Sequence, residues 1–187
     1  MGRIIVTEFV SLDGVMEAPG GGESYKHGGW TFEINRGKEG DQFKLDEALD
    51  AEALLLGRVT YQGFAAAWPS RKGEFADKFN SMPKYVISST LHKGEWNNSK
   101  VLKGDVVREV SDLRRALRGN IVVHGSARLV QTLIEHDLVD ELRLMVFPVV
   151  LGTGKRLFGT TGDKKRLHLT ESKTVGDGIV ILIYKLP

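Results

Sequence analysis

The sequence predicts an α/β fold in which a central mixed, mostly parallel β-sheet lies between two layers of helices as a three-layer sandwich. Two observations carry this prediction. Apolar runs with the character of buried strands alternate with helical segments along most of the chain, as in parallel sheets. The last two strand-like segments, 167–175 and 179–186, flank Gly176-Asp177-Gly178, which indicates a C-terminal antiparallel hairpin.

The first half of the chain predicts three strands and three helices. The strands are expected at 3–10, 53–56 and 84–88, and the helices at 41–50, 59–67 and 74–81. Apolar runs closed by a turn signal or a glycine identify the strands, and Pro83 stops the third helix. The segment 19–29 is rich in glycine and poor in apolar residues. We expect it to be a long functional loop, a lid over a pocket.

The second half continues the alternation. Strands are expected at 105–110, 121–124 and 139–147, followed by the hairpin, and helices at 112–118 and 127–136. Asp112 is the expected N-cap of the first of these helices. No repeat or linker interrupts the pattern, so a single domain should span residues 1–187.

Composition excludes several classes of function. The chain of 187 residues is 41% hydrophobic and 27% charged and has no cysteine, so disulfides, thiol nucleophiles and Cys-bound metal centres are excluded. Lys+Arg 26 against Asp+Glu 24 leaves a net charge of only +2, which does not indicate nucleic-acid binding. A signal peptide and a long uncharged apolar span are both missing, so we expect a cytoplasmic protein without a membrane partner.

Two segments share one design, in which a buried strand, a glycine and a helix start follow one another. They are centred on Gly57-Arg58 and Gly125-Ser126. A glycine lets the backbone approach a ligand, and the free N–H groups of a helix N-terminus favour phosphate. Each glycine could instead simply end its strand. Two such sites at the carboxyl ends of strands favour a dinucleotide lying across the sheet edge.

A third polar segment, Ser88-Ser89-Thr90, follows the strand at 84–88. Hydroxyl groups beside Arg58 suit a 2′-phosphate and therefore favour NADPH over NADH. The alternative is a plain polar turn. The G-x-G-x-x-G, P-loop and G-x-S-x-G motifs are all missing, and the five histidines are dispersed, so no metal site is expected.

A set of motifs in a particular order carries a family resemblance. In chain order they are Ser11-Leu-Asp-Gly14, Leu55-Leu-Gly-Arg-Val-Thr-Tyr61, Val86-Ile-Ser-Ser-Thr-Leu91, His124-Gly-Ser-Ala-Arg-Leu129 and Phe147-Pro-Val-Val-Leu-Gly-Thr-Gly-Lys-Arg-Leu-Phe158. Together they cover nearly the whole chain. The sequence resembles the dihydrofolate-reductase-like family typified by the C-terminal reductase domain of the bifunctional riboflavin-biosynthesis protein.

The resemblance implies an NADPH-binding fold and a homodimer that acts on a small molecule. The implied cofactor residues are Gly57, Arg58, Thr60, Ser88, Ser89, Gly125, Ser126, Ala127 and Leu129. Asp13 is expected near the substrate as the catalytic carboxylate. The chain carries no cysteine-bearing zinc deaminase domain, so it resembles a stand-alone reductase unit. Leu142, Leu144, Val146 and Val150 could form the dimer face or face the core.

The Leu-Pro-x-Asp/Glu motif that supplies the proton in dihydrofolate reductases is missing. The proton donor could be Asp13, Glu33, Asp41 or water, although for both Glu33 and Asp41 a surface carboxylate or a helix cap is the favoured explanation. Trp30, Phe32 and Trp68 are candidate stacking platforms, or core aromatics.

The expected function is an NADPH-dependent reductase that transfers hydride to a C=N or C=O carbon of a pterin- or pyrimidine-like heterocycle. This function is similar to that of 5-amino-6-(5-phosphoribosylamino)uracil reductase. A substrate of that kind would need a second phosphate-binding site, and the candidate residues for that site are Arg36, Lys38 and Lys155. The alternative is a non-catalytic nucleotide- or ligand-binding module with the same fold.

Overall fold

The computed structural model describes residues 1–22, 24–160 and 162–187, so the part of the expected lid at residue 23 lies outside the described residues. The strands are β1 (Arg3–Ser11), β2 (Ala51–Gly57), β3 (Lys84–Ile87), β4 (Ser99–Leu102), β5 (Asn120–Val123), β6 (Glu141–Phe147), β7 (His168–Val175) and β8 (Ile179–Lys185). The helices are α1 (Gly37–Asp50), α2 (Arg58–Ala67), α3 (Glu74–Ser81), α4 (Val106–Ala116) and α5 (Ala127–Glu135), with a short 3-10 helix at Trp30–Glu33.

The strands form one sheet in the order β4-β3-β2-β5-β1-β6-β8-β7. Every neighbouring pair from β4 to β6 is parallel. The pairs β6–β8 and β8–β7 are antiparallel. The predicted mixed, mostly parallel sheet with a C-terminal hairpin is therefore confirmed.

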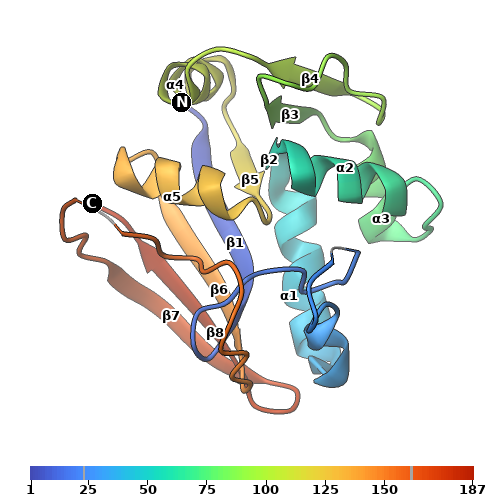
Figure 1. Cartoon of the computed structure of the whole chain (residues 1–187), viewed down its shortest axis with the longest axis vertical. Coiled ribbons are helices and arrows are strands. Elements are labelled where there is room, and N and C mark those ends of the chain that lie inside the picture. Colours follow the sequence, from blue (N-terminus) through green and yellow to red (C-terminus); the bar gives the residue numbers. More distant parts are fainter. Residues whose placement is uncertain (23, 161) are drawn as a thin grey trace.

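Helices cover both faces of the sheet. In Figure 1, α4 and α5 lie to the left of the central strands, and α1, α2 and α3 lie to their right. Val110 of α4 and Leu133 of α5 pack in one apolar cluster with the strands. Ala48 of α1 and Phe79 of α3 belong to a second cluster. The predicted three layers are confirmed.

Residues 105–110, predicted as a strand, begin helix α4, so this prediction was wrong. Asp105, not Asp112, is the N-cap, and its carboxylate accepts a hydrogen bond from the Arg108 N–H at 3.0 Å. Val110 and Leu113 are the buried residues of this helix. Their spacing of three is helical, although the β-branched residues had favoured a strand. Strand β4 was missed because it is short and polar.

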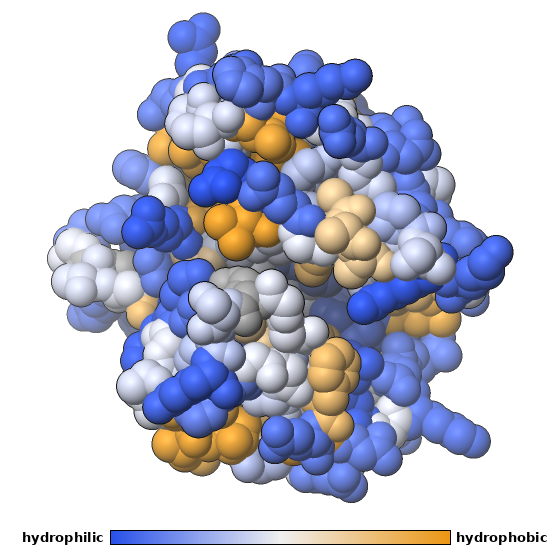
Figure 2. Space-filling view, turned by 45° about the vertical axis from the view of Figure 1, so that its right-hand side comes forward, coloured by the Kyte–Doolittle hydropathy of each residue, from blue (hydrophilic) through white to orange (hydrophobic). Residues whose placement is uncertain are grey.

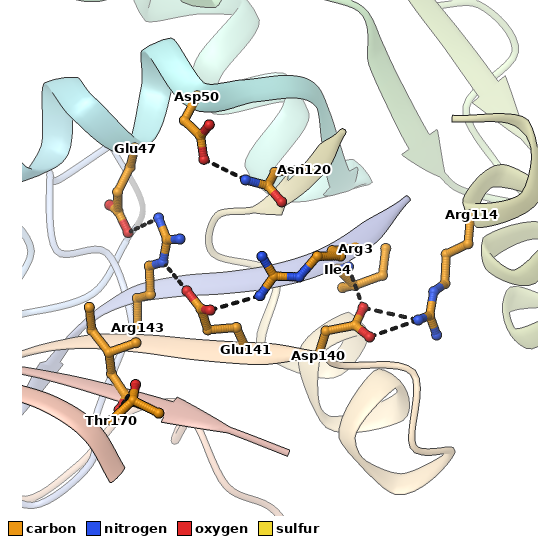
Figure 3. A network of polar contacts seen from close by, with 11 residues as sticks. Arg3, Ile4, Glu47, Asp50, Arg114, Asn120, Asp140, Glu141, Arg143 and Thr170 are labelled. Atoms are coloured by element: carbon orange, nitrogen blue, oxygen red, sulfur yellow. Dashed lines mark hydrogen bonds and ion pairs between the residues drawn. The ribbon is translucent and has the colours of Figure 1, made fainter. Parts of the chain in front are cut away.

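A chain of buried and half-buried ion pairs crosses the molecule from the start of β1 to α1 (Figure 3). Arg3 pairs with Glu141 at 2.8 Å, Glu141 with Arg143 at 2.5 Å, and Arg143 with Glu47 at 3.5 Å. Glu47 in turn pairs with Lys44 at 2.5 Å. Glu141 and Glu47 each lie between two basic side chains, and the series ends at Lys44, which lines the cleft described next. In the described part of the molecule, no helix is long and apolar enough to span a membrane.

Candidate functional site

A cavity of about 1490 Å³ lies at the carboxyl ends of the parallel strands. Figure 2 shows a hollow near the centre of this face, with hydrophobic atoms beside it and hydrophilic side chains around its rim. All of the predicted cofactor residues line this cleft: Gly57, Arg58, Thr60, Ser88, Ser89, Gly125, Ser126, Ala127 and Leu129. They meet because β3, β2 and β5 are parallel neighbours and end at the same edge of the sheet.

The two glycine motifs touch each other. The Ser126 hydroxyl accepts a hydrogen bond from the Gly57 N–H at 2.8 Å and donates one to Thr60 Oγ1 at 2.9 Å. A Cβ on Gly57 would lie 2.9 Å from Ser126 Oγ, and a Cβ on Gly125 would lie 2.9 Å from Thr60 Oγ1. Gly125 also has a φ of +60°. Glycine at these two positions therefore lets the two loops approach each other. This is a second reason for glycine there, beside the predicted one, which is close approach of the backbone to a ligand.

Helices α2 and α5 both begin at the cleft, and among the described residues neither has a side-chain N-cap hydrogen bond. The first intrahelical bond of α5 is donated by the Val130 N–H to the Ser126 carbonyl. The preceding N–H groups and the positive ends of two helix dipoles thus face one cavity. This arrangement favours an anion with more than one phosphate.

The third polar segment forms the far rim of the cleft. Ser88 Oγ accepts hydrogen bonds from the N–H groups of Thr90 and Leu91 at 3.2 and 3.0 Å. These hydrogen bonds form a polar turn, which was the alternative interpretation of this segment. The turn also leaves Ser89 and Thr90 exposed at the rim. Arg58 is exposed as well, and it donates to Gln62 at 3.0 Å. Hydroxyls and a guanidinium therefore share this end of the cleft.

Glu8 is a cleft residue that the sequence argument missed. Its side chain is buried, and its Oε2 accepts a hydrogen bond from the Gly125 N–H at 2.9 Å. Its Oε1 has no hydrogen-bond partner among the described residues. Burial raises the pKa of Glu8 to about 8, against the Gly125 hydrogen bond and the positive charge of Lys44, which lower it. The available signal was a lone carboxylate inside the apolar run of β1.

The wall of the cleft on the α1 side holds the buried side chain of Lys44. Lys44 Nζ donates to Thr7 Oγ1 at 2.8 Å and to Glu47, and it lies 5.2 Å from the centre of the Phe9 ring. His124, at the end of β5, has its pKa lowered well below the usual value by desolvation and by Lys44, so it is neutral. The floor of the cleft therefore offers neutral and cationic groups.

Aromatic side chains line the cleft between α2 and α3. Trp68 and Phe79 have ring centres 5.0 Å apart, and Phe75 stacks on Phe79 at 4.5 Å. Of the predicted stacking platforms, Phe32 and Trp68 line the cleft. Trp30 does not. It is buried against Phe147, so of the two alternatives for Trp30, a stacking platform or a core aromatic, the structure shows the core aromatic.

The structure places Asp13 outside the set of residues that line the cleft. Its carboxylate accepts hydrogen bonds from the N–H groups of Leu151 at 3.1 Å and Gly152 at 2.8 Å, and from the Ser11 hydroxyl at 2.6 Å. These bonds, with the Ser11 hydroxyl contributing most, lower the pKa of Asp13 to about 2. Asp13 is therefore ionised at neutral pH and holds the segment 151–152.

The other candidate acids and phosphate ligands divide between the cleft and the surface. Asp41, Arg36 and Lys155 line the cleft, whereas Glu33 and Lys38 do not. Arg36 pairs with Asp41 at 2.9 Å, and Lys155 pairs with Glu17 at 3.3 Å.

Residues 19–22 of the loop predicted as a lid line the cleft, whereas closure of this loop stays a prediction. The chain before it is joined to a distant segment. The Met16 N–H donates to the Lys155 carbonyl at 2.9 Å, and the Leu157 N–H donates to the Gly14 carbonyl at 3.0 Å. Tyr25 Oη donates to the Thr153 carbonyl at 2.6 Å. The loop and the segment 151–157 thus form one wall.

Comparisons with known proteins agree with this geometry. A family model described as the RibD C-terminal domain matches residues 3–181. The uncharacterised Bacillus subtilis (strain 168) protein YyaP is 28% identical over 187 residues, covering 97% of this chain and 94% of that protein.

Two solved structures share the fold. A protein from Shewanella sp. PV-4 assigned to riboflavin biosynthesis has a TM-score of 0.80 at 21% identity, covering 99% of both chains. Enterococcus faecalis dihydrofolate reductase, complexed with NADP(H), has a TM-score of 0.59 at 14% identity, covering 99% of this chain and 96% of that one. The predicted dihydrofolate-reductase-like fold is confirmed.

Proposed function

Because the chain belongs to the RibD C-terminal domain family, we propose that it is an NADPH-dependent reductase of a small heterocyclic substrate. The observation that carries this proposal is the pair of uncapped helix N-termini of α2 and α5, joined through Ser126 at one cleft. Family membership supports a reductase-type function, and the Enterococcus faecalis enzyme of the same fold is described in complex with NADP(H).

The residues of the cleft fit a dinucleotide phosphate. The N–H groups that begin α2 and α5 would bind the pyrophosphate, because helix N-termini attract anions. Arg58, Ser88 and Ser89 would bind the 2′-phosphate at the β3 end of the cleft. The bound cofactor supplies a hydride. Gly57, Gly125 and the Ser126 hydroxyl would hold the two phosphate-binding loops in register.

The substrate would occupy the part of the cleft between α1 and α2. Phe32, Phe64 and Trp68 offer flat apolar surfaces there, which suit a pterin- or pyrimidine-like ring. Lys44 also lines the cleft, and its ammonium group would present a hydrogen-bond donor to such a ring. Of the carboxylates proposed as proton donors, Asp41 lines the cleft. Asp41 or an ordered water would deliver the proton.

Asp13 would then support the site from outside. Its ionised carboxylate binds the backbone of Leu151 and Gly152, and the segment that follows is joined to the glycine-rich loop. We propose that Asp13 positions this wall of the cleft.

The test of function is NADPH oxidation by purified protein, followed at 340 nm, with a panel of dihydropterins, dihydrofolate and a ribosylaminopyrimidine phosphate. Consumption of NADPH with one of these classes supports the proposal. Tight NADPH binding without oxidation by the whole panel would instead favour a binding module. One observation keeps that alternative open, since Asp41 is neutralised by Arg36 at 2.9 Å.

We also propose a homodimer. Leu142 and Leu144, for which the dimer face and the core were the two alternatives, are buried in the core. Phe158, Leu167 and Leu169 are exposed large hydrophobic residues. Phe158 and Leu167 border a second cavity, of about 280 Å³, and Leu169 lies on the edge strand β7. Light scattering coupled to size-exclusion chromatography should report twice the mass of one chain, and the mass of one chain would contradict this assignment.

A further inference from the structure

Glu8 lies where the two central strands separate. The last paired residues of β1 and β5 are Val6 and Val123, and beyond them β5 runs into the Gly125 loop. The Glu8 side chain lies beneath that loop and accepts the Gly125 N–H at 2.9 Å. It also lines the same cleft as the N-termini of α2 and α5. A carboxyl group thus stands among the groups that favour phosphate.

The hydrogen bonding of this carboxyl is incomplete. Oε2 acts as an acceptor toward Gly125, whereas Oε1 is buried without a hydrogen-bond partner in the described chain. Lys44 and Glu47 of α1 act on Glu8 with opposite signs, and burial outweighs both, so that the group stays protonated at neutral pH. The neighbouring His124 at the end of β5 is neutral. A protonated Oε1 is a donor that needs an acceptor.

We propose that Glu8 is a nucleotide-binding residue, a neutral carboxylic acid that donates a hydrogen bond from Oε1 to an oxygen of the dinucleotide bound over the Gly125 loop. This inference rests on the proposed function. The acceptor is a phosphoryl oxygen or the carboxamide oxygen of the nicotinamide. Loss of the proton would remove the donor and place a negative charge beside the bound phosphates. Only the protonated protein should therefore bind the nucleotide tightly.

The first test is NADPH binding as a function of pH, measured by calorimetry for the wild-type protein and Glu8→Gln. Because the pKa of Glu8 is about 8, the wild-type Kd should rise about tenfold or more from about pH 7.5 to about pH 9.5. Glu8→Gln keeps a neutral donor of the same shape, so its Kd should stay within about threefold of the wild-type value at about pH 7.5 and remain flat up to about pH 9.5. A flat wild-type profile, or the same slope in both proteins, would overturn the proposal.

The two possible acceptors are distinguished by repeating the titration with 2′-phospho-ADP-ribose. This compound carries the phosphates of NADPH but no nicotinamide. A pH dependence that persists identifies a phosphoryl oxygen, and one that disappears identifies the carboxamide. Both results support a contact between Glu8 and the nucleotide.

A second measurement needs no ligand. In protein labelled with ¹³C at the glutamate carboxyls, the resonance lost in Glu8→Gln should titrate near pH 8, the pKa of about 8 expected for Glu8. Titration near the ordinary value of 4.5, with NADPH bound normally, would overturn the role of Glu8 alone. Titration near 8 without NADPH binding at any pH would overturn the proposed function and, with it, the nucleotide as the ligand of Glu8.

Discussion

The Ser126 hydroxyl accepts a hydrogen bond from the Gly57 N–H at 2.8 Å, although 69 residues separate them in the chain. The same hydroxyl donates to Thr60 Oγ1 at 2.9 Å. Two helix N-termini from different βα units are thereby fixed relative to each other without any ligand. A prearranged pair of anion sites costs less ordering on binding than two independent loops would.

Gly57→Ala should damage this arrangement, because the new Cβ would lie 2.9 Å from Ser126 Oγ. The backbone of Gly57 has a φ of −80°, which alanine accepts, so the clash is the only cost. We expect NADPH affinity to fall about tenfold and stability to fall by about 1–3 kcal/mol. Adding Ser126→Gly should recover part of the stability, which chemical denaturation would measure.

Gly63→Ala is the matched control for stability. Gly63 lies within α2, and a Cβ there would have no neighbour within 4 Å. We expect this variant to be up to about 1 kcal/mol more stable than the wild type. Equal losses in Gly57→Ala and Gly63→Ala would show that the contact with Ser126 is not what demands glycine at position 57.

Arg58→Ala tests the preference for NADPH. Arg58 is exposed at the rim that carries Ser88 and Ser89. If its guanidinium binds the 2′-phosphate, its removal should weaken NADPH about tenfold and change NADH affinity far less. Arg108→Ala, on α4 and outside the cleft, should leave both affinities unchanged. Parallel losses for NADPH and NADH would assign Arg58 to another part of the nucleotide.

Glu8→Gln should change how stability depends on pH. Between about pH 4.5 and about pH 8, the unfolded chain ionises Glu8 while the folded protein keeps the proton, because burial raises its pKa to about 8. Unfolding then releases a proton, so wild-type stability falls as the pH rises through this range. Glu8→Gln should be more stable than the wild type at neutral pH, by about 3 kcal/mol, and should lose that advantage near pH 4.

Glu141→Gln should behave in the opposite way. Burial raises the pKa of Glu141, but bonds from Arg143 and Arg3 outweigh burial and leave it lowered. The wild-type protein should therefore be more stable than this variant at neutral pH, and the difference should shrink as the pH falls through the range in which Glu141 is protonated. Urea denaturation of both variants at several pH values would measure the two trends. Parallel trends would contradict the assigned pKa directions.

Lys84→Met should destabilise the fold without touching the cleft. The buried Lys84 ammonium donates to the carbonyls of Asn80, Met82 and Asn97 at 2.8 to 2.9 Å. Methionine leaves these three carbonyls without that donor, so we expect a loss of about 2–4 kcal/mol in the free energy of unfolding. Lys103→Met, at an exposed position, should change it by less than about 0.5 kcal/mol. An equally small effect at Lys84 would show that the carbonyls find other partners.

The rims of the cleft could be predicted because their signals are local. A buried strand followed by a glycine and a helix start can be recognised within ten residues, and parallel strands bring such ends to one edge. Helix α4 was misread because its valines favour a strand as strongly as its apolar spacing favours a helix. Only the burial of Val110 and Leu113 under the sheet decides between the two.

The floor of the cleft could not be predicted, because it depends on contacts between distant segments. Lys44 reaches Thr7 only when α1 docks on β1. Burial in the folded chain raises the pKa of Glu8 and keeps it protonated, against the hydrogen bond from Gly125. Asp13 was expected beside the substrate. Its partners, the N–H groups of Leu151 and Gly152, lie 138 and 139 residues away and carry no sequence signal.

We propose above all that the cleft whose two phosphate-binding loops are joined by Ser126 binds NADPH. Calorimetric titration of the purified protein with NADPH and with NADH at neutral pH tests it most directly. We predict a Kd in the micromolar range for NADPH, about −8 kcal/mol, and weaker binding of NADH. If neither nucleotide binds folded protein below about millimolar concentration, about −4 kcal/mol, the cleft is not a dinucleotide site and the assignment as a reductase is contradicted.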